Sequence, residues 1–104
     1  MERKKSKIVY CFDIDNTLCK TDGTDYECAA PIYSRIAKVN TLYKDNTIIL
    51  FTGRGFGTGK DWSEVTKKQV KTWGVKHHKL LFGKPGADRF IDDRGENADV
   101  FFGK

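Results

Sequence analysis

Residues 7–19 read KIVYCFDIDNTLC, and this stretch decides how the chain folds. A short apolar run rich in strand-forming residues is typical of a buried strand, so one is predicted over residues 7–13. The run leads into two carboxylates, Asp13 and Asp15, and carboxylates are seldom buried without a partner. We therefore expect both aspartates at the carboxyl end of the strand, where a crevice leaves them accessible.

The remainder of the chain alternates between helix-like and strand-like segments. Helices are predicted over residues 31–44, where Pro31 suits the first turn, and over residues 61–73, which Gly74 ends. Further strands are predicted at TIILF, KLLF and RFID, which are residues 47–51, 79–82 and 89–92. This order favours an α/β fold in which a small parallel sheet is flanked by helices.

Three segments are predicted to lack a long element. Residues 20–30 are polar and contain a glycine, so they are interpreted as a loop. The glycine-rich stretch 54–60 is interpreted in the same way. Residues 95–104 are expected to form little more than a turn and a fragment of strand.

Length and composition predict one domain over residues 1–104 and exclude several classes of protein. With 38% hydrophobic and 32% charged residues, the chain is of the soluble globular class. No apolar run nears the roughly 20 residues that cross a bilayer, so no membrane partner is expected. The three cysteines lack metal-like spacing and indicate free thiols, which predicts a reducing, cytoplasmic location.

Polar side chains follow all of the predicted strands. Parallel strands end at the same edge of a sheet, and ligands bind beyond those ends. The residues that follow the strands, in chain order, are Asp13 and Asp15, then Thr52, Gly53 and Arg54, then Lys84, and finally Asp92 and Asp93. We expect these groups to meet at one edge of the sheet.

The aspartates at this edge indicate a metal site. Four carboxylates in one crevice would repel one another strongly without a counter-ion. Mg²⁺ prefers one or two carboxylates together with water and a phosphate oxygen. The other groups suit an anion, because Thr52 offers a hydroxyl, Gly53 an unobstructed N–H and Lys84 a positive charge. A metal site beside an anion cradle predicts phosphoryl transfer.

The same residues form four motifs that resemble those of the haloacid dehalogenase (HAD) superfamily. FDIDNTL resembles its first motif, FTGR its second, GKP with Lys84 its third, and IDDR its fourth, of the double-aspartate type. All four occur in order over residues 8–94. The resemblance implies a minimal HAD-like, Rossmann-like fold.

By position, the resemblance implies a role for each residue. Asp13 would be the nucleophile and a Mg²⁺ ligand, and Asp15 the general acid and base, with its backbone carbonyl on the metal. Thr17 would support the loop, and the phosphoryl group would be bound by Thr52, Gly53 and Lys84. A further metal ligand would come from the pair Asp92 and Asp93, of which we favour Asp93.

Structural interpretations of these residues stay open beside the functional ones. Arg54 could contact substrate or form a salt bridge with a nearby acid. Thr52 and Gly53 could be a plain strand-to-loop turn, and Lys84 an exposed loop residue with Lys79 as its rival. The two aspartates of IDDR could cap a turn.

The acid at Asp15 resembles the phosphatases of the superfamily and implies hydrolysis of a phosphomonoester through an aspartyl-phosphate. The short spacings between Thr17 and Thr52 and between Thr52 and Lys84 leave no room for a cap domain. An open site of this kind implies a large substrate or a homo-oligomer in which a neighbouring subunit closes it.

Two branches of the family supply candidate substrates. DYECAAP, TIILFTGRG and GKPGADRFIDDR resemble small phosphatases encoded with capsule and surface-polysaccharide genes, which implies a sugar or polyol phosphate. IDDR also resembles the 3′-phosphatase domain of phage polynucleotide kinases, and the basic helix predicted at 61–73 would suit nucleic acid. The competing class is a non-catalytic binding module that keeps the fold.

Overall fold

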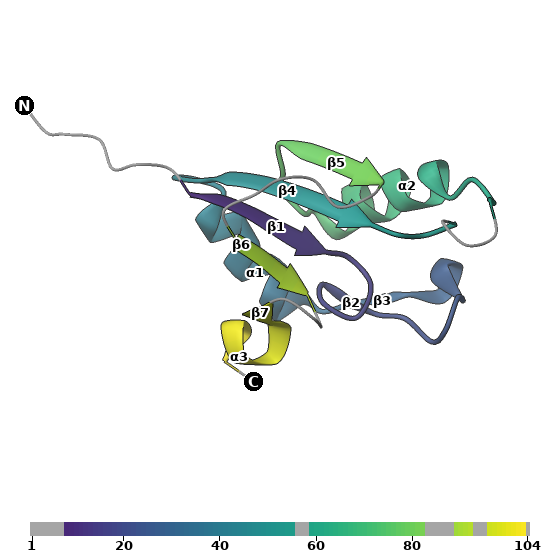
Figure 1. Cartoon of the computed structure of the whole chain (residues 1–104), viewed down its shortest axis with the longest axis horizontal. Coiled ribbons are helices and arrows are strands. Elements are labelled where there is room, and N and C mark those ends of the chain that lie inside the picture. The colour runs from purple at the N-terminus through teal and green to yellow at the C-terminus, as the bar shows by residue number, and fades with distance from the viewer. Residues whose placement is uncertain (1–7, 56–58, 83–88, 93–95, 104) are drawn as a thin grey trace, which may run out of the picture.

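The computed structural model describes residues 8–55, 59–82, 89–92 and 96–103. Its main feature is a five-stranded sheet in the order β5-β4-β1-β6-β7, in which all neighbours are parallel (Figure 1). The strands are β1 (Val9–Asp13), β4 (Thr47–Thr52), β5 (Lys79–Phe82), β6 (Arg89–Asp92) and β7 (Glu96–Asn97). The predicted α/β fold with a parallel sheet flanked by helices is therefore confirmed.

The two main helices lie where the apolar spacing predicts them. They are α1 (Tyr33–Leu42) and α2 (Ser63–Trp73). Helix α2 begins where the Asp61 carboxylate accepts the Ser63 N–H at 2.9 Å, and it ends at Gly74, whose φ of 74° is left-handed. None of the helices in the described part of the chain has the length and apolar character that a membrane crossing would require.

The segment predicted as a loop at 20–30 contains regular structure. Strands β2 (Cys19–Lys20) and β3 (Ala30–Pro31) form an antiparallel pair, and the 3₁₀ turn η1 (Tyr26–Cys28) lies between them. Pro31 is thus a strand residue and not the first turn of α1, which corrects that prediction. Two-residue strands are too short to show a hydrophobic period, so the sequence carried no signal for them.

The chain end also holds more than the predicted turn and strand fragment. After β7 comes the short helix α3 (Ala98–Phe102). Its Phe101 and Phe102 rings lie 5.8 Å and 5.9 Å from the ring of Phe12, between ring centroids. These aromatic contacts stabilise a helix of five residues that would not form alone.

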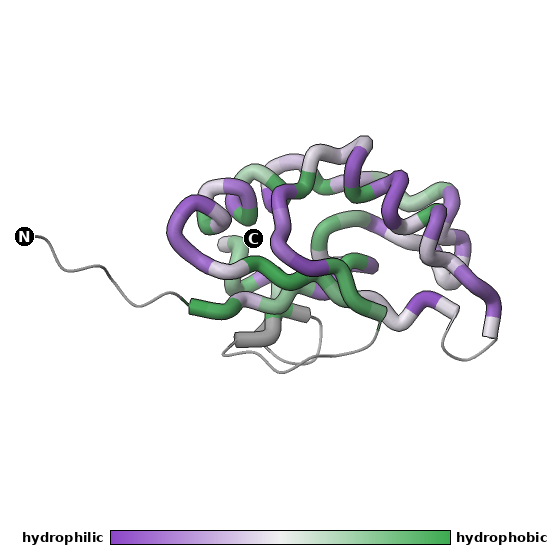
Figure 2. The backbone as a smooth tube through the Cα atoms, turned by 90° about the horizontal axis from the view of Figure 1, so that it is seen from above, coloured by the Kyte–Doolittle hydropathy of each residue, from purple (hydrophilic) through white to green (hydrophobic). Residues whose placement is uncertain are grey.

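The three helices of the described part pack on one face of the sheet (Figures 1 and 2). The core on this face includes Phe12, Leu50, Val39 and Val70, which are almost fully buried. A smaller cluster of Cys11, Ile49 and Phe51 lies on the opposite face. The sheet is thus held mainly by one large core on its helix-covered face.

Candidate functional site

The strand register brings the predicted site residues to one edge. Asp13 ends β1 and pairs with Phe51 of β4, the residue before Thr52. On the other side Phe12 pairs with Ile91, so the backbones of Asp13 and Asp92 lie at the same level of the sheet. Lys84 and Asp93 lie outside the described residues. The edge therefore carries Asp13, Thr52 and Asp92 as expected, by backbone position.

The chain turns sharply just after β1. The Ile14 N–H donates to the Asp13 Oδ1 at 2.8 Å, which orients that carboxylate. Asn16 has a φ of 61°, a left-handed conformation that asparagine tolerates better than most residues. The Leu18 N–H then donates to the Ile14 carbonyl at 3.0 Å. This turn sets Asp13 on the strand and Asp15 on the loop.

Asp15 is surrounded by hydrogen-bond donors. Its Oδ1 accepts from the Thr21 hydroxyl at 2.7 Å and from Arg54 Nη2 at 2.8 Å. Its Oδ2 accepts from Arg54 Nε at 2.9 Å and from the Thr52 hydroxyl at 3.4 Å. The carboxylate is therefore held in one orientation by donors at both of its oxygens.

Arg54 is the counter-ion of Asp15. The arginine is only 5% exposed, and its fork-like contact with the carboxylate is of the strong, bidentate kind. Its Nη1 donates to the Thr66 hydroxyl at 3.1 Å and to Gln69 Oε1 at 2.6 Å. Of the two interpretations of Arg54, these contacts match the salt bridge with a nearby acid.

Thr17 and Thr52 are both buried at this edge. The Thr17 carbonyl accepts from Arg35 Nη1 at 3.0 Å, while its hydroxyl has no hydrogen-bond partner among the described residues. The Thr52 hydroxyl also accepts the Arg54 N–H at 3.1 Å. Gly53 is exposed, and a Cβ added there would meet open space, so its backbone is accessible to a ligand.

Four residues of this site were not predicted from the sequence. Thr21, Tyr26, Thr66 and Gln69 contact Asp15 or Arg54, the Tyr26 ring by lying 4.8 Å from the guanidinium carbon. They come from β2–β3 and from α2, and no motif joins them. No signal in the sequence identifies them, because only the packed structure shows that Arg54 is buried and requires several acceptors.

The charges at the edge are balanced in part by the protein itself. Arg54 offsets Asp15, so the predicted repulsion among four carboxylates is smaller than expected from the sequence. Burial raises the pKa of the neighbouring Cys19 thiol, whose sulfur lies 3.8 Å from Asp15 Oδ1, and keeps a second negative charge away. Within the described residues, no three acids, histidines or cysteines gather as metal ligands.

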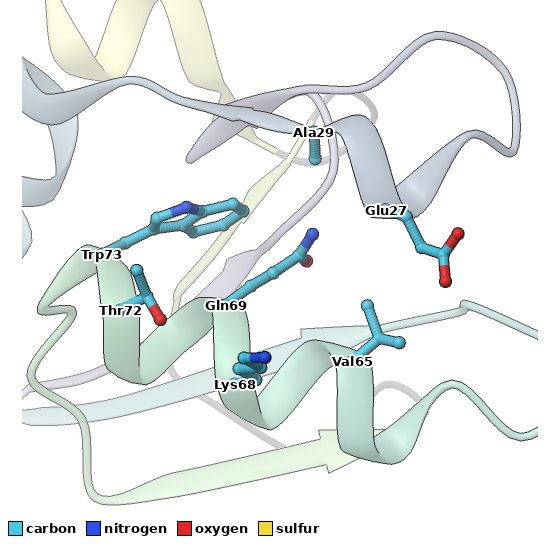
Figure 3. A pocket seen from close by; sticks show the side chains of 7 residues that line it. All are labelled: Glu27, Ala29, Val65, Lys68, Gln69, Thr72 and Trp73. Carbon is cyan, nitrogen blue, oxygen red and sulfur yellow. The ribbon is translucent and has the colours of Figure 1, made fainter.

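A separate pocket of about 370 Å³ lies between α2 and the η1 segment (Figure 3). It is lined by Glu27, Ala29, Val65, Lys68, Gln69, Thr72 and Trp73. Asp13, Asp15 and Thr52 are not among these residues. Gln69 thus belongs to both places, because it lines the pocket and contacts Arg54.

Comparisons with known proteins support the fold. No protein-family model matches the chain, and no curated protein gives a significant match. A crystal structure of a structural-genomics target from Vibrio cholerae is similar, with a TM-score of 0.74 and 22% identity. The similarity covers 93% of this chain and 89% of that chain, so nearly the whole α/β domain is shared.

Proposed function

We propose that the chain is a Mg²⁺-dependent phosphomonoester hydrolase of the HAD type, without a cap domain. The observation that carries the proposal is the pair of aspartates at the carboxyl end of β1, with Asp15 fixed by Arg54, Thr21 and Thr52. Asp13 and Asp15 are thereby offered at the edge of a parallel sheet where ligands bind.

In the proposed reaction Asp13 is the nucleophile. One of its carboxylate oxygens forms a bond to phosphorus while the bond from phosphorus to the ester oxygen breaks. To act as the acid, Asp15 has to turn one oxygen away from Arg54 and carry a proton there; it gives that proton to the leaving oxygen and later takes one from the water that attacks the aspartyl-phosphate. That water releases inorganic phosphate and restores the Asp13 carboxylate, so protons and charge balance over the cycle.

The donors at this edge fit a hard cation, since carboxylate and carbonyl oxygens are the ligands that Mg²⁺ prefers. Asp13 and the backbone carbonyl of Asp15 would hold the ion, with Asp93 or Asp92 completing the set. When bound, the ion would neutralise charge on the phosphoryl group. Gly53, Thr52 and Lys84 would hold the phosphoryl oxygens. Because the Thr52 hydroxyl is bonded to Asp15 and Arg54, we assign its part to positioning as much as to binding.

Metal dependence is the first test. Hydrolysis of an aryl phosphate is expected to fall at least about 100-fold in chelator and to recover with added Mg²⁺, because several kcal/mol of charge stabilisation is lost. Initial rates with matched ionic strength measure this. Equal rates with and without the chelator would refute the metal-dependent mechanism.

The substrate class is a separate prediction. We expect a sugar or polyol phosphate of surface-polysaccharide synthesis to be hydrolysed with a higher kcat/KM than a 3′-phosphorylated oligonucleotide. One feature favours the oligonucleotide instead: the exposed lysines of α2, which are Lys67, Lys68 and Lys71. A panel of both substrate types at two salt concentrations decides the matter. Preference for the oligonucleotide, with strong salt dependence, would overturn our choice.

Binding without turnover of any phosphate ester would indicate the remaining alternative, a non-catalytic module with this fold. A cytoplasmic location and a homo-oligomer that closes the open site stay predictions from the sequence.

A further inference from the structure

The side-chain amide of Gln69 joins two segments that are far apart in the sequence. Its Nε2 donates to the Tyr26 carbonyl at 2.7 Å, and its Oε1 accepts from Arg54 Nη1 at 2.6 Å. An amide nitrogen only donates and an amide oxygen only accepts, so these two partners fix which way the amide points. Gln69 therefore cannot rotate without losing both bonds.

Gln69, Tyr26 and Arg54 each contact the other two. Tyr26 accepts from Gln69 through its carbonyl, and its aromatic ring lies 4.8 Å from the Arg54 guanidinium carbon. Arg54 in turn directs its other nitrogens at Asp15, with Nη2 at 2.8 Å from Oδ1. Without Gln69, Nη1 would keep only the Thr66 hydroxyl among the acceptors that the described residues provide.

We infer that Gln69 is a positioning residue: by accepting from Arg54 Nη1, with its amide oriented by the bond to Tyr26, it fixes the guanidinium and, through it, the Asp15 carboxylate. The effect of this positioning on catalysis rests on the proposed function. Gln69 contacts neither Asp13 nor Asp15 in the described structure, so it acts through Arg54 alone. A displacement of about 1 Å in a catalytic group can cost up to roughly 100-fold in rate, so a loss of this contact is measurable.

Two substitutions test the donor and the acceptor of the Gln69 amide separately. Gln69→Met keeps the length of the side chain and loses both bonds. Gln69→Glu keeps an acceptor for Arg54 and loses the donor to Tyr26. At a temperature below the onset of unfolding, we expect kcat to fall roughly 10- to 30-fold in Gln69→Met and about 3-fold or less in Gln69→Glu, with KM within about 2-fold in both. Thr72→Val, one turn further along the same pocket wall, is the matched control and should leave both constants unchanged.

A second readout does not depend on activity. The Arg54 Nε–H is buried and bonded to Asp15, so its NMR signal should exchange slowly with water. We expect Gln69→Met to shift and broaden this signal, and Gln69→Glu and Thr72→Val to preserve it. An unchanged Arg54 signal in Gln69→Met overturns the inference, and so does full kcat in that variant. If the wild-type chain hydrolyses no phosphate ester, the proposed function fails, and the NMR signal alone decides whether Gln69 positions Arg54.

Discussion

The Asp13→Asn variant is expected to lose at least about 1,000-fold in phosphatase kcat while it remains folded. An amide oxygen is a far weaker nucleophile than a carboxylate, and removal of a nucleophile typically costs several orders of magnitude. The fold should persist because the asparagine oxygen can still accept the Ile14 N–H, a bond of 2.8 Å in the native chain. Steady-state kinetics and a thermal melt on the same preparation measure both quantities.

The matched control for this variant is Asp45→Asn, which changes an exposed aspartate in the turn between α1 and β4. It removes the same charge and should keep full activity. If Asp13→Asn retained a tenth or more of the wild-type kcat, Asp13 would not be the nucleophile. A lower melting temperature with lost activity would point to a structural role instead.

Replacement of Arg54 by Met is expected to destabilise the fold by about 3–5 kcal/mol, since it leaves a partly buried carboxylate without its counter-ion. The Asp15 side chain is 18% exposed and the Arg54 side chain 0%, so water compensates little. Total stabilities of domains are only about 5–15 kcal/mol, so the variant should approach the limit of folding. Urea unfolding at neutral pH measures the change in the free energy of unfolding.

A double substitution sharpens this prediction. Arg54→Met combined with Asp15→Leu removes both charges, so the pair should cost less than the sum of the single changes. Lys44→Met, at an exposed lysine in the same chain, should change the free energy of unfolding by less than about 0.5 kcal/mol. A loss below about 1 kcal/mol in Arg54→Met would show that the salt bridge contributes little to the fold.

This coupling affects how Asp15 is tested. Asp15→Asn would leave a buried guanidinium without a carboxylate, so lost activity in that variant would combine catalysis with stability. Asp13, at the end of β1, is the cleaner position for a catalytic test, because its replacement does not disturb Arg54.

The sequence predicted the two main helices from their hydrophobic period, and strands β1, β4, β5 and β6 as short runs of strand-forming residues. KLLF and RFID are strands β5 and β6 over the residues predicted, and the left-handed Gly74 ends α2. Strands β2 and β3, of two residues each, and the five-residue helix α3 were missed, because they show no hydrophobic pattern of their own and depend on tertiary contacts.

The candidate site also has residues that the sequence predicted and residues that it did not. Residues at strand ends could be placed from the sequence, since a parallel sheet brings all carboxyl ends to one edge. The partners of Arg54 could not, because Asp15 precedes it by 39 residues, while Thr66 and Gln69 follow it by 12 and 15. Contacts between side chains from a loop, a strand end and a helix leave no repeating pattern in the chain.

By itself, the sequence determined that β1 is a buried strand with Asp13 and Asp15 at its end, because an apolar run that stops at two carboxylates allows little else. Only the tertiary structure decided what Asp15 meets there. Folding places α2 and η1 beside β4, and Arg54 is then buried between acceptors from α2 and the Tyr26 ring of η1. A buried guanidinium requires such acceptors, and only the packed chain can supply them together.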